Sequence, residues 1–215
     1  MDASVEPIVE ARPTFLERAL AADTKPALTP LDALETARAI WLETGRLEMG
    51  ALAEELGLSR ATLYRWVGSK ERLLGEVAWS FAQETFDQAR RRVDGSGADY
   101  IAAVIERYLK SAIAFPALRR FIEQDPEYAL KVLTSKHSSM QRRSVAATRE
   151  LLAEQVEAGA FQPPLDLDTL AYVIVRIAES FLFGDIITGS EPDVDKACEA
   201  IDALLHAAPP ARKRS

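Results

Sequence analysis

The feature that most constrains the fold is a pair of short helix-forming segments separated by one glycine. The first spans about residues 49–56, and Gly57 ends it because glycine adopts a left-handed backbone at little cost. Ser59 is a suitable N-cap for the second, which ends near Gly68. Both have an inward apolar face, formed by Leu52, Ala53 and Leu56 on the first and by Leu63 and Val67 on the second. This pattern is typical of a helix-turn-helix, whose second helix enters the major groove of DNA.

Helical signals continue on both sides of this unit. Thr29, Pro30 and Asp32 form a helix start, and Gly45 ends that helix. Ser69 caps another helix that reaches about residue 93. Helical patterns follow at about 98–115, 117–123, 126–135, 138–159, 166–187 and 193–207, a short one is expected at 14–22, and no segment alternates like a strand. We therefore predict an all-α protein.

The exposed face of the second short segment is cationic, although the chain as a whole is acidic. The formal net charge is −7, yet no acidic residue lies between Gly57 and Lys70. Arginine side chains suit base edges, whereas hydroxyl and lysine groups suit phosphates. The predicted DNA contacts are Arg60, Ala61, Thr62, Tyr64, Arg65, Trp66 and Lys70. The alternative is an ordinary corner between two helices with a solvated basic face.

The segment from about Leu34 to Leu74 resembles the DNA-binding domain of the TetR family of bacterial regulators. The resemblance is carried by Ala53, Gly57, Ser59, Thr62-Leu63-Tyr64, Ser69-Lys70-Glu71 and Leu73-Leu74. Two positions depart from the family: Trp66 stands where His or Tyr is usual, and Met49-Gly50 stand where a phosphate-binding Thr often opens the helix. The C-terminal half resembles the QsdR branch, which is linked with the degradation of quorum-signal lactones.

The resemblance implies a division of the chain into four parts. These are an N-terminal extension (1–28), a three-helix helix-turn-helix domain (29–75), a helical effector-binding and dimerisation bundle (76–208) and a basic tail (209–215). It also implies a homodimeric transcriptional repressor of double-stranded operator DNA, released by a small apolar or amphipathic effector such as a lactone. The alternatives are an activator of the same family, a helical hydrolase or small-molecule carrier without a DNA role, and an interaction module using residues 170–187.

The segment at 166–187 is apolar almost all round, so it must be covered on every side. A second copy of the chain is an economical source of cover, although the last two helices could instead bury one another. The predicted dimer contacts are Val173, Ile177, Phe181, Ile201, Leu204 and Leu205. Arg176 and Glu179 lie one turn apart on this segment. They are candidates for an internal ion pair, a dimer contact or a pair of anchors for a ligand, and we favour the first two interpretations.

Large side chains of the middle helices are candidates for lining an apolar effector cavity. They are Trp79, Gln83, Phe86, Tyr108, Phe115, Phe121, Tyr128, Met140 and Phe181. For each aromatic position the alternative is a place in the plain core.

Nothing in the sequence points to catalysis. His137 and His206 lack the spacing of metal ligands, and no glycine-rich phosphate loop is present. Cys198 has no second cysteine to pair with, which suits a reducing cytosol. The most apolar segment, 170–187, contains charged residues and is therefore a poor membrane span. We expect a cytoplasmic protein with no catalytic residue, metal, cofactor or membrane contact.

Overall fold

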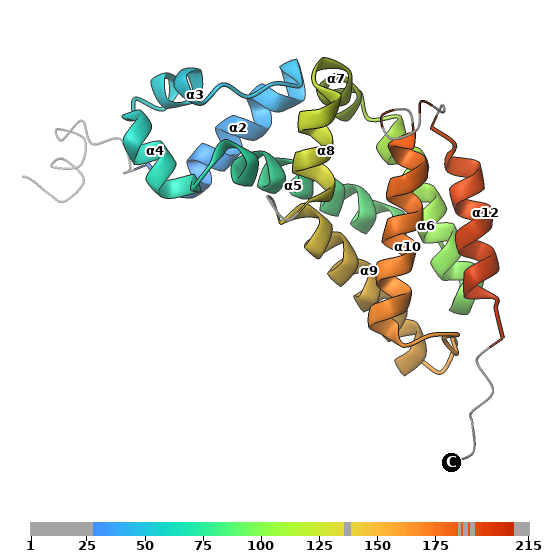
Figure 1. Ribbon diagram of the computed structural model, residues 1–215. Helices are drawn as coiled ribbons and strands as arrows, with labels where there is room; N and C mark the ends of the chain where they lie inside the picture. The colour runs from blue at the N-terminus through green and yellow to red at the C-terminus, as the bar shows by residue number, and fades with distance from the viewer. Residues whose placement is uncertain (1–27, 136–138, 185, 187–188, 190–191, 209–215) are drawn as a thin grey trace, which may run out of the picture.

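The computed structural model describes residues 28–135, 139–184, 186, 189 and 192–208. These residues form ten helices and no strand, which confirms the all-α prediction (Figure 1). In order, the helices are α2 (Pro30–Thr44), α3 (Met49–Glu55), α4 (Arg60–Val67), α5 (Lys70–Arg91), α6 (Gly97–Ile113), α7 (Pro116–Gln124), α8 (Pro126–Thr134), α9 (Met140–Glu157), α10 (Leu167–Leu182) and α12 (Val194–Leu205). The predicted helix at 14–22 and the basic tail lie outside the described residues.

Polar caps that the sequence predicts begin three of the N-terminal helices. The Thr29 hydroxyl accepts a hydrogen bond from the Asp32 N–H, and the Asp32 carboxylate accepts one from the Thr29 N–H. The Thr29 hydroxyl also donates to the Asp32 carboxylate, and this bond, together with the one from the Thr29 N–H, holds the pKa of Asp32 below its usual value. Ser59 accepts from the N–H of Thr62, and Ser69 accepts from the N–H of Arg72. The two serines therefore fix where α4 and α5 begin.

The helix predicted at 166–187 is shorter in the structure. α10 ends at Leu182, and Phe183 adopts φ −113° and ψ 23°, outside helical geometry. The Phe183 side chain is buried, at 4% exposure, in a core that also contains Trp41 and Leu74. Because burial of the Phe183 ring in this core is favourable, the chain leaves helical geometry at this residue and α10 does not continue. None of the helices in the described part of the chain combines the length and the apolar composition that a membrane span requires.

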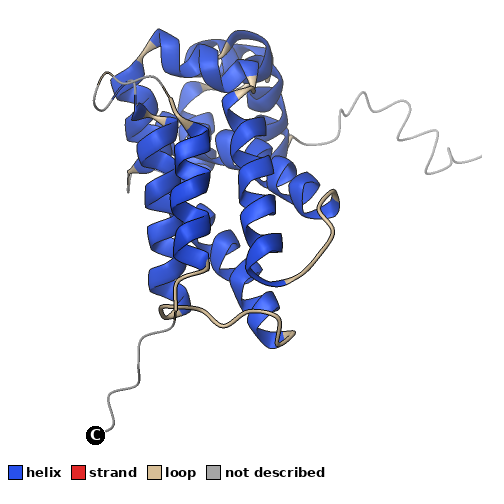
Figure 2. Ribbon diagram, turned by 90° about the vertical axis from the view of Figure 1, so that its right-hand side faces the viewer, coloured by secondary structure: helices blue, strands red, loops and turns tan. Residues whose placement is uncertain are grey.

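The apolar side chains form two cores. The first lies among α2–α5, α7 and α8, on the left of Figure 1, and the second lies among α6, α9, α10 and α12, on the right. Figure 2 faces the second group, whose long helices run along one another. α5 joins both cores, because Leu74 is buried in the first and Phe86 in the second. The division predicted at residues 75 and 76 falls inside this continuous helix.

Candidate functional site

α3, the turn at Gly57 and α4 have the arrangement expected of a helix-turn-helix. Gly57 has φ 64°, a left-handed conformation that side chains other than glycine rarely adopt. The N–H of Leu58 donates to the carbonyl of Ala53 at 2.8 Å, which closes the turn. Leu63 is fully buried, so the opposite side of α4 faces outward.

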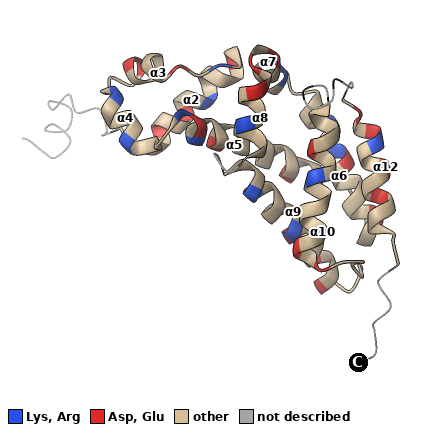
Figure 3. Ribbon diagram, viewed as in Figure 1, with Lys and Arg blue, Asp and Glu red and all other residues tan. Residues whose placement is uncertain are grey.

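Four of the predicted DNA-contact residues form the exposed face of α4. They are Arg60, Ala61, Tyr64 and Arg65, and Tyr64 is 43% exposed. Residues at these spacings share one side of a helix. Figure 3 shows α4 at the end of the molecule, with basic residues on it and far from α12. This face can present guanidinium and hydroxyl groups to a DNA groove.

The other three predicted contacts are partly engaged within the protein. The Thr62 hydroxyl lies 3.0 Å from that of Ser59, and Trp66 is half-buried against the first core. The Lys70 Nζ lies 3.2 Å from Glu48 Oε1 and 5.7 Å from the centre of the Tyr128 ring. Lys70 is therefore less free to meet a phosphate than its position in the sequence suggests.

The exposed cation Arg72, in the first turn of α5, was missed in the sequence. Its side chain lies against Gly68, directly after α4. The signal was available, because Arg72 follows the stretch without acidic residues by two positions. Arg72 adds a positive charge beside the exposed face of α4.

Gly50 makes room for the guanidinium of Arg60 at the first turn of α3. A Cβ added at Gly50 would lie 2.6 Å from Arg60 Nη2, so any larger residue would displace this group. The sequence departs from the resembled family at this position, where a phosphate-binding Thr is frequent. The guanidinium of Arg60 therefore lies where the side chain of that Thr would begin.

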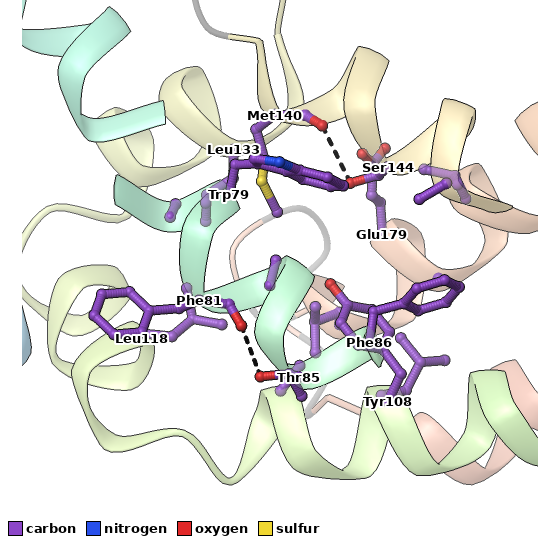
Figure 4. A pocket seen from close by; sticks show the side chains of 18 of the residues that line it. Trp79, Phe81, Thr85, Phe86, Tyr108, Leu118, Leu133, Met140, Ser144 and Glu179 are labelled. Carbon is purple, nitrogen blue, oxygen red and sulfur yellow. Dashed lines mark hydrogen bonds between the residues drawn. The ribbon is translucent and has the colours of Figure 1, made fainter. Parts of the chain in front are cut away.

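A cavity of about 120 Å³ lies where the two cores meet. Its walls come from α2, α5, α6, α7, α8, α9 and α10. Figure 4 shows Phe81 and Leu118 on one side of it, and Ser144 and Glu179 toward the other. A cavity of about 150 Å³ in another protein binds benzene, so this slightly smaller one has room for about one aromatic ring.

Five of the nine predicted cavity residues line this cavity: Trp79, Phe86, Tyr108, Phe115 and Met140. The other four do not. Gln83 lines a depression on the outer side of Trp79 and Phe86, and Phe181 packs against the second core. Phe121 and Tyr128 belong to the first core, where their rings meet edge to face at 6.3 Å. The three aromatic residues therefore follow the plain-core alternative, and the expectation for Gln83 was wrong because its side chain lines the other depression.

Several lining residues were missed in the sequence. Trp41 and Phe81 line the cavity and stack with ring centres 5.6 Å apart. Nothing in the sequence indicated that Trp41 lines a cavity, because its place in the helix before the helix-turn-helix already accounted for its apolar side chain. Ser144 and Thr148 lie one turn apart on α9, and both face the cavity. That spacing on a helical segment was the only available clue.

Glu179 brings a carboxylate into the wall of the cavity. Arg176 Nη1 contacts its Oε2 at 2.5 Å, which confirms the predicted internal ion pair. The Glu179 side chain is only 12% exposed, whereas that of Arg176 is 44% exposed. Burial raises the pKa of Glu179 to about 7, against the smaller opposing effect of Arg176. Burial and the nearby Glu179 also raise the pKa of Tyr108 to about 12.

The predicted dimer residues divide into two groups. Ile201 and Leu205 are 1% and 2% exposed within the single chain, so they have little surface left for a partner. Val173, Ile177, Phe181 and Leu204 are only partly buried. The outward side of α10 carries Tyr172, which is 50% exposed. The last two helices therefore bury one another in part, and a face of α10 is left open.

The remaining chemistry-bearing groups form no centre in the described part of the chain. No group of three or more His, Cys, Asp or Glu residues there has the geometry to hold a metal ion. Burial raises the pKa of the Cys198 thiol to about 11, which keeps it protonated near neutral pH. His206 binds Asp99 and Asp202 at the surface.

A family model and one solved structure agree with this architecture. Residues 96–206 match the family model described as tetracyclin repressor-like, C-terminal domain. The chain is similar to the R. erythropolis transcriptional repressor QsdR from the TetR family, at 30% identity and TM-score 0.78, over 88% of this chain and 100% of that one. It is also aligned with PfmR of Thermus thermophilus, a TetR family regulator (24% identity, TM-score 0.40, covering 80% and 96%). No curated protein matches the chain significantly.

Proposed function

Because the chain belongs to the TetR family of transcriptional regulators, we propose that it is a homodimeric repressor that an effector releases from operator DNA. The effector is a small apolar or amphipathic molecule bound in the cavity, and the protein works in the cytoplasm. The similar QsdR is described as a transcriptional repressor, which supports repression over activation. The exposed face of α4 supports the DNA contact, and the apolar cavity supports the ligand.

The observation that carries this proposal is the position of Trp41. Its ring lies on α2, directly before the helix-turn-helix, and is 2% exposed in the first core. The same ring lines the cavity, together with Phe81 of α5 and Phe115. A ligand in the cavity therefore touches the helices that hold α4. A coupling of about 1–3 kcal/mol between two such sites is typical.

DNA recognition is tested by selecting genomic fragments that the purified protein retains. We expect an operator with two half-sites, because a dimer places two recognition helices on one duplex. Arg65→Ala should weaken binding to the preferred operator by about 1–3 kcal/mol. It should also reduce the base preference at one base pair in each half-site. Arg107→Ala on α6 removes another exposed charge, far along the chain, and is the control. If Arg65→Ala has unchanged base preferences, this result contradicts base recognition by α4.

Release by an effector is tested on the selected operator. A compound that binds the protein should weaken operator binding, and the operator should weaken binding of that compound by the same factor. Titration calorimetry of the compound with and without operator measures the second effect, and reciprocity then gives the first. Equal affinity for the compound in the two titrations would contradict induction, even if the protein binds both partners.

A further inference from the structure

The charge of the cavity wall is one-sided. Among the described residues that line it, Glu179 is the only one with a charged side chain, and there is no Lys, Arg or His. The rest of the wall is apolar or aromatic, with a few hydroxyl groups. An anionic molecule inside would thus find no cation in the wall and would face a carboxylate.

The carboxylate of Glu179 is incompletely compensated. Arg176 contacts one of its oxygens, Oε2, and the described residues make no hydrogen bond to the other. Arg176 approaches from α10 itself and is largely exposed, so its charge is shared with solvent. Of the facing groups, Tyr108 is a phenol that stays neutral near pH 7, because its pKa is raised to about 12, so its charge does not balance that of the carboxylate. The ion therefore carries a desolvation cost that a second cation would relieve.

The aromatic wall also suits a cation. Two rings that line the cavity already have a guanidinium group over them: Arg38 lies 4.3 Å from the centre of Phe81, and Arg143 lies 5.8 Å from that of Trp79. Both arginines are neutralised by carboxylates of α5, Glu84 and Glu76. Rings in this setting attract positive charge through their faces.

The charged group of the cavity wall lies to one side of the cavity. Ser144 and Glu179 lie toward one side, and Phe81 and Leu118 lie toward the other (Figure 4). Thr148, which is 7% exposed, lies one turn beyond Ser144 on α9 and adds a hydroxyl to the lining. A molecule with one polar end and one apolar body would be held in a single orientation.

We propose that the cavity takes a small apolar molecule with one protonated amine, which binds Glu179 while its apolar body packs against the aromatic wall. This rests on the proposed function in one respect, namely that the cavity is the effector site. The amine donates to the Glu179 carboxylate, and the body fills the space between Trp79, Phe86 and Tyr108. Carboxylates and phosphates are excluded by the charge of Glu179, and neutral molecules lack the ionic contact.

The test uses three probes with a shared phenyl ring and different head groups: phenethylamine, phenethyl alcohol and phenylacetate. Each is titrated calorimetrically into the full-length protein without DNA at pH 8, where Glu179 is ionised. We expect the amine to bind about tenfold more tightly than the alcohol, because a hydrogen bond between charged groups is worth a factor of ten or more. Phenylacetate should bind more weakly than either.

Glu179→Gln keeps the shape of the side chain and removes its charge. It should reduce amine binding about tenfold and leave alcohol binding nearly unchanged. Glu157→Gln, at the exposed end of α9, is the matched control and should alter neither. The comparison of the three probes on the unmodified protein needs no variant, so it stands even if Glu179→Gln folds poorly.

Two results would overturn the proposal: alcohol or phenylacetate binding as tightly as the amine, or amine binding that is unchanged in Glu179→Gln. The outcome is separate from the proposed function, because these titrations contain no DNA. An amine that binds through Glu179 but leaves operator affinity unchanged supports the ligand class and contradicts induction. An uncharged compound that releases operator, with no preference for the amine, supports induction and contradicts the ligand class.

Discussion

At the scale of single residues, the cavity depends on one carboxylate in an apolar wall. Glu179 is 12% exposed, and burial raises its pKa from 4.5 to about 7. The folded protein therefore holds this proton more tightly than the unfolded chain does. Between pH 4.5 and 7 the folded state binds more protons, so the free energy of unfolding falls as the pH rises through this range. Tyr108 stays neutral throughout this range, because its pKa is raised to about 12.

Glu179→Gln removes this titration, so its effect on stability should depend on pH. The unfolding free energy of the variant minus that of the unmodified protein should be about 1–2 kcal/mol larger at pH 8 than at pH 5. This is less than the full pKa shift implies, because the Glu179 side chain keeps some solvent contact. Urea denaturation at the two pH values measures the difference. A gain that is the same at both would show that the folded pKa of Glu179 is ordinary.

At the scale of elements, α7 fastens the C-terminal end of α2. The Arg120 guanidinium donates to the carbonyl of Leu42 at 2.7 Å, and the Gln124 amide donates to that of Thr44 at 3.0 Å. Gln124 also accepts a hydrogen bond from Arg46, just before α3. These bonds use carbonyls that the last turn of a helix leaves without partners. α7 thus helps to set the position of the helix-turn-helix relative to the cavity wall.

Breaking this attachment should lower stability selectively. Arg120→Met keeps much of the aliphatic length and removes the bond to Leu42, so we expect a loss of about 1–3 kcal/mol. Arg119→Met is the control at the neighbouring residue, because the Arg119 side chain is exposed and its guanidinium lies 3.7 Å from Glu123, one turn away. That change should stay within about 0.5 kcal/mol. Chemical denaturation measures the loss of unfolding free energy in both variants. Equal losses would mean that the hydrogen bond between Arg120 and Leu42 contributes little.

At the scale of the whole molecule, α10 presents a face that its own chain leaves open. Tyr172 is 50% exposed there, and Val173 beside it is partly buried. On the opposite side, Leu170 and Ile174 are buried in the second core. A second copy of the chain, placed by a two-fold axis, would cover the open face.

Tyr172→Glu should therefore disrupt the dimer without unfolding the chain. A carboxylate brought into an apolar interface is desolvated without a partner, and the dissociation constant should rise roughly a hundredfold or more. Leu42→Glu, at a similarly exposed position on α2, is the control. Analytical ultracentrifugation measures both. A variant at Tyr172 that dimerises as tightly as the unmodified protein would place the interface elsewhere.

The sequence alone determined the helices and the helix-turn-helix, because these depend on short-range physics. Thr29, Ser59 and Ser69 each bond to a backbone N–H three residues away, and Gly57 acts at its own position. The period of apolar residues likewise placed Leu63 inside. The family resemblance added the functional class, which composition and spacing do not contain.

Only the tertiary structure decided which side chains meet between helices. The cavity joins Trp41 to Glu179, residues far apart in the chain, and no local period relates them. For the same reason Phe121 and Tyr128 looked like cavity residues but pack in the first core, and Lys70 looked free but contacts Glu48. α10 also ended early, because the buried position of Phe183 comes from helices that precede it by many residues. Periodicity gives each helix its inward face, but the packing of the other helices decides what that face touches.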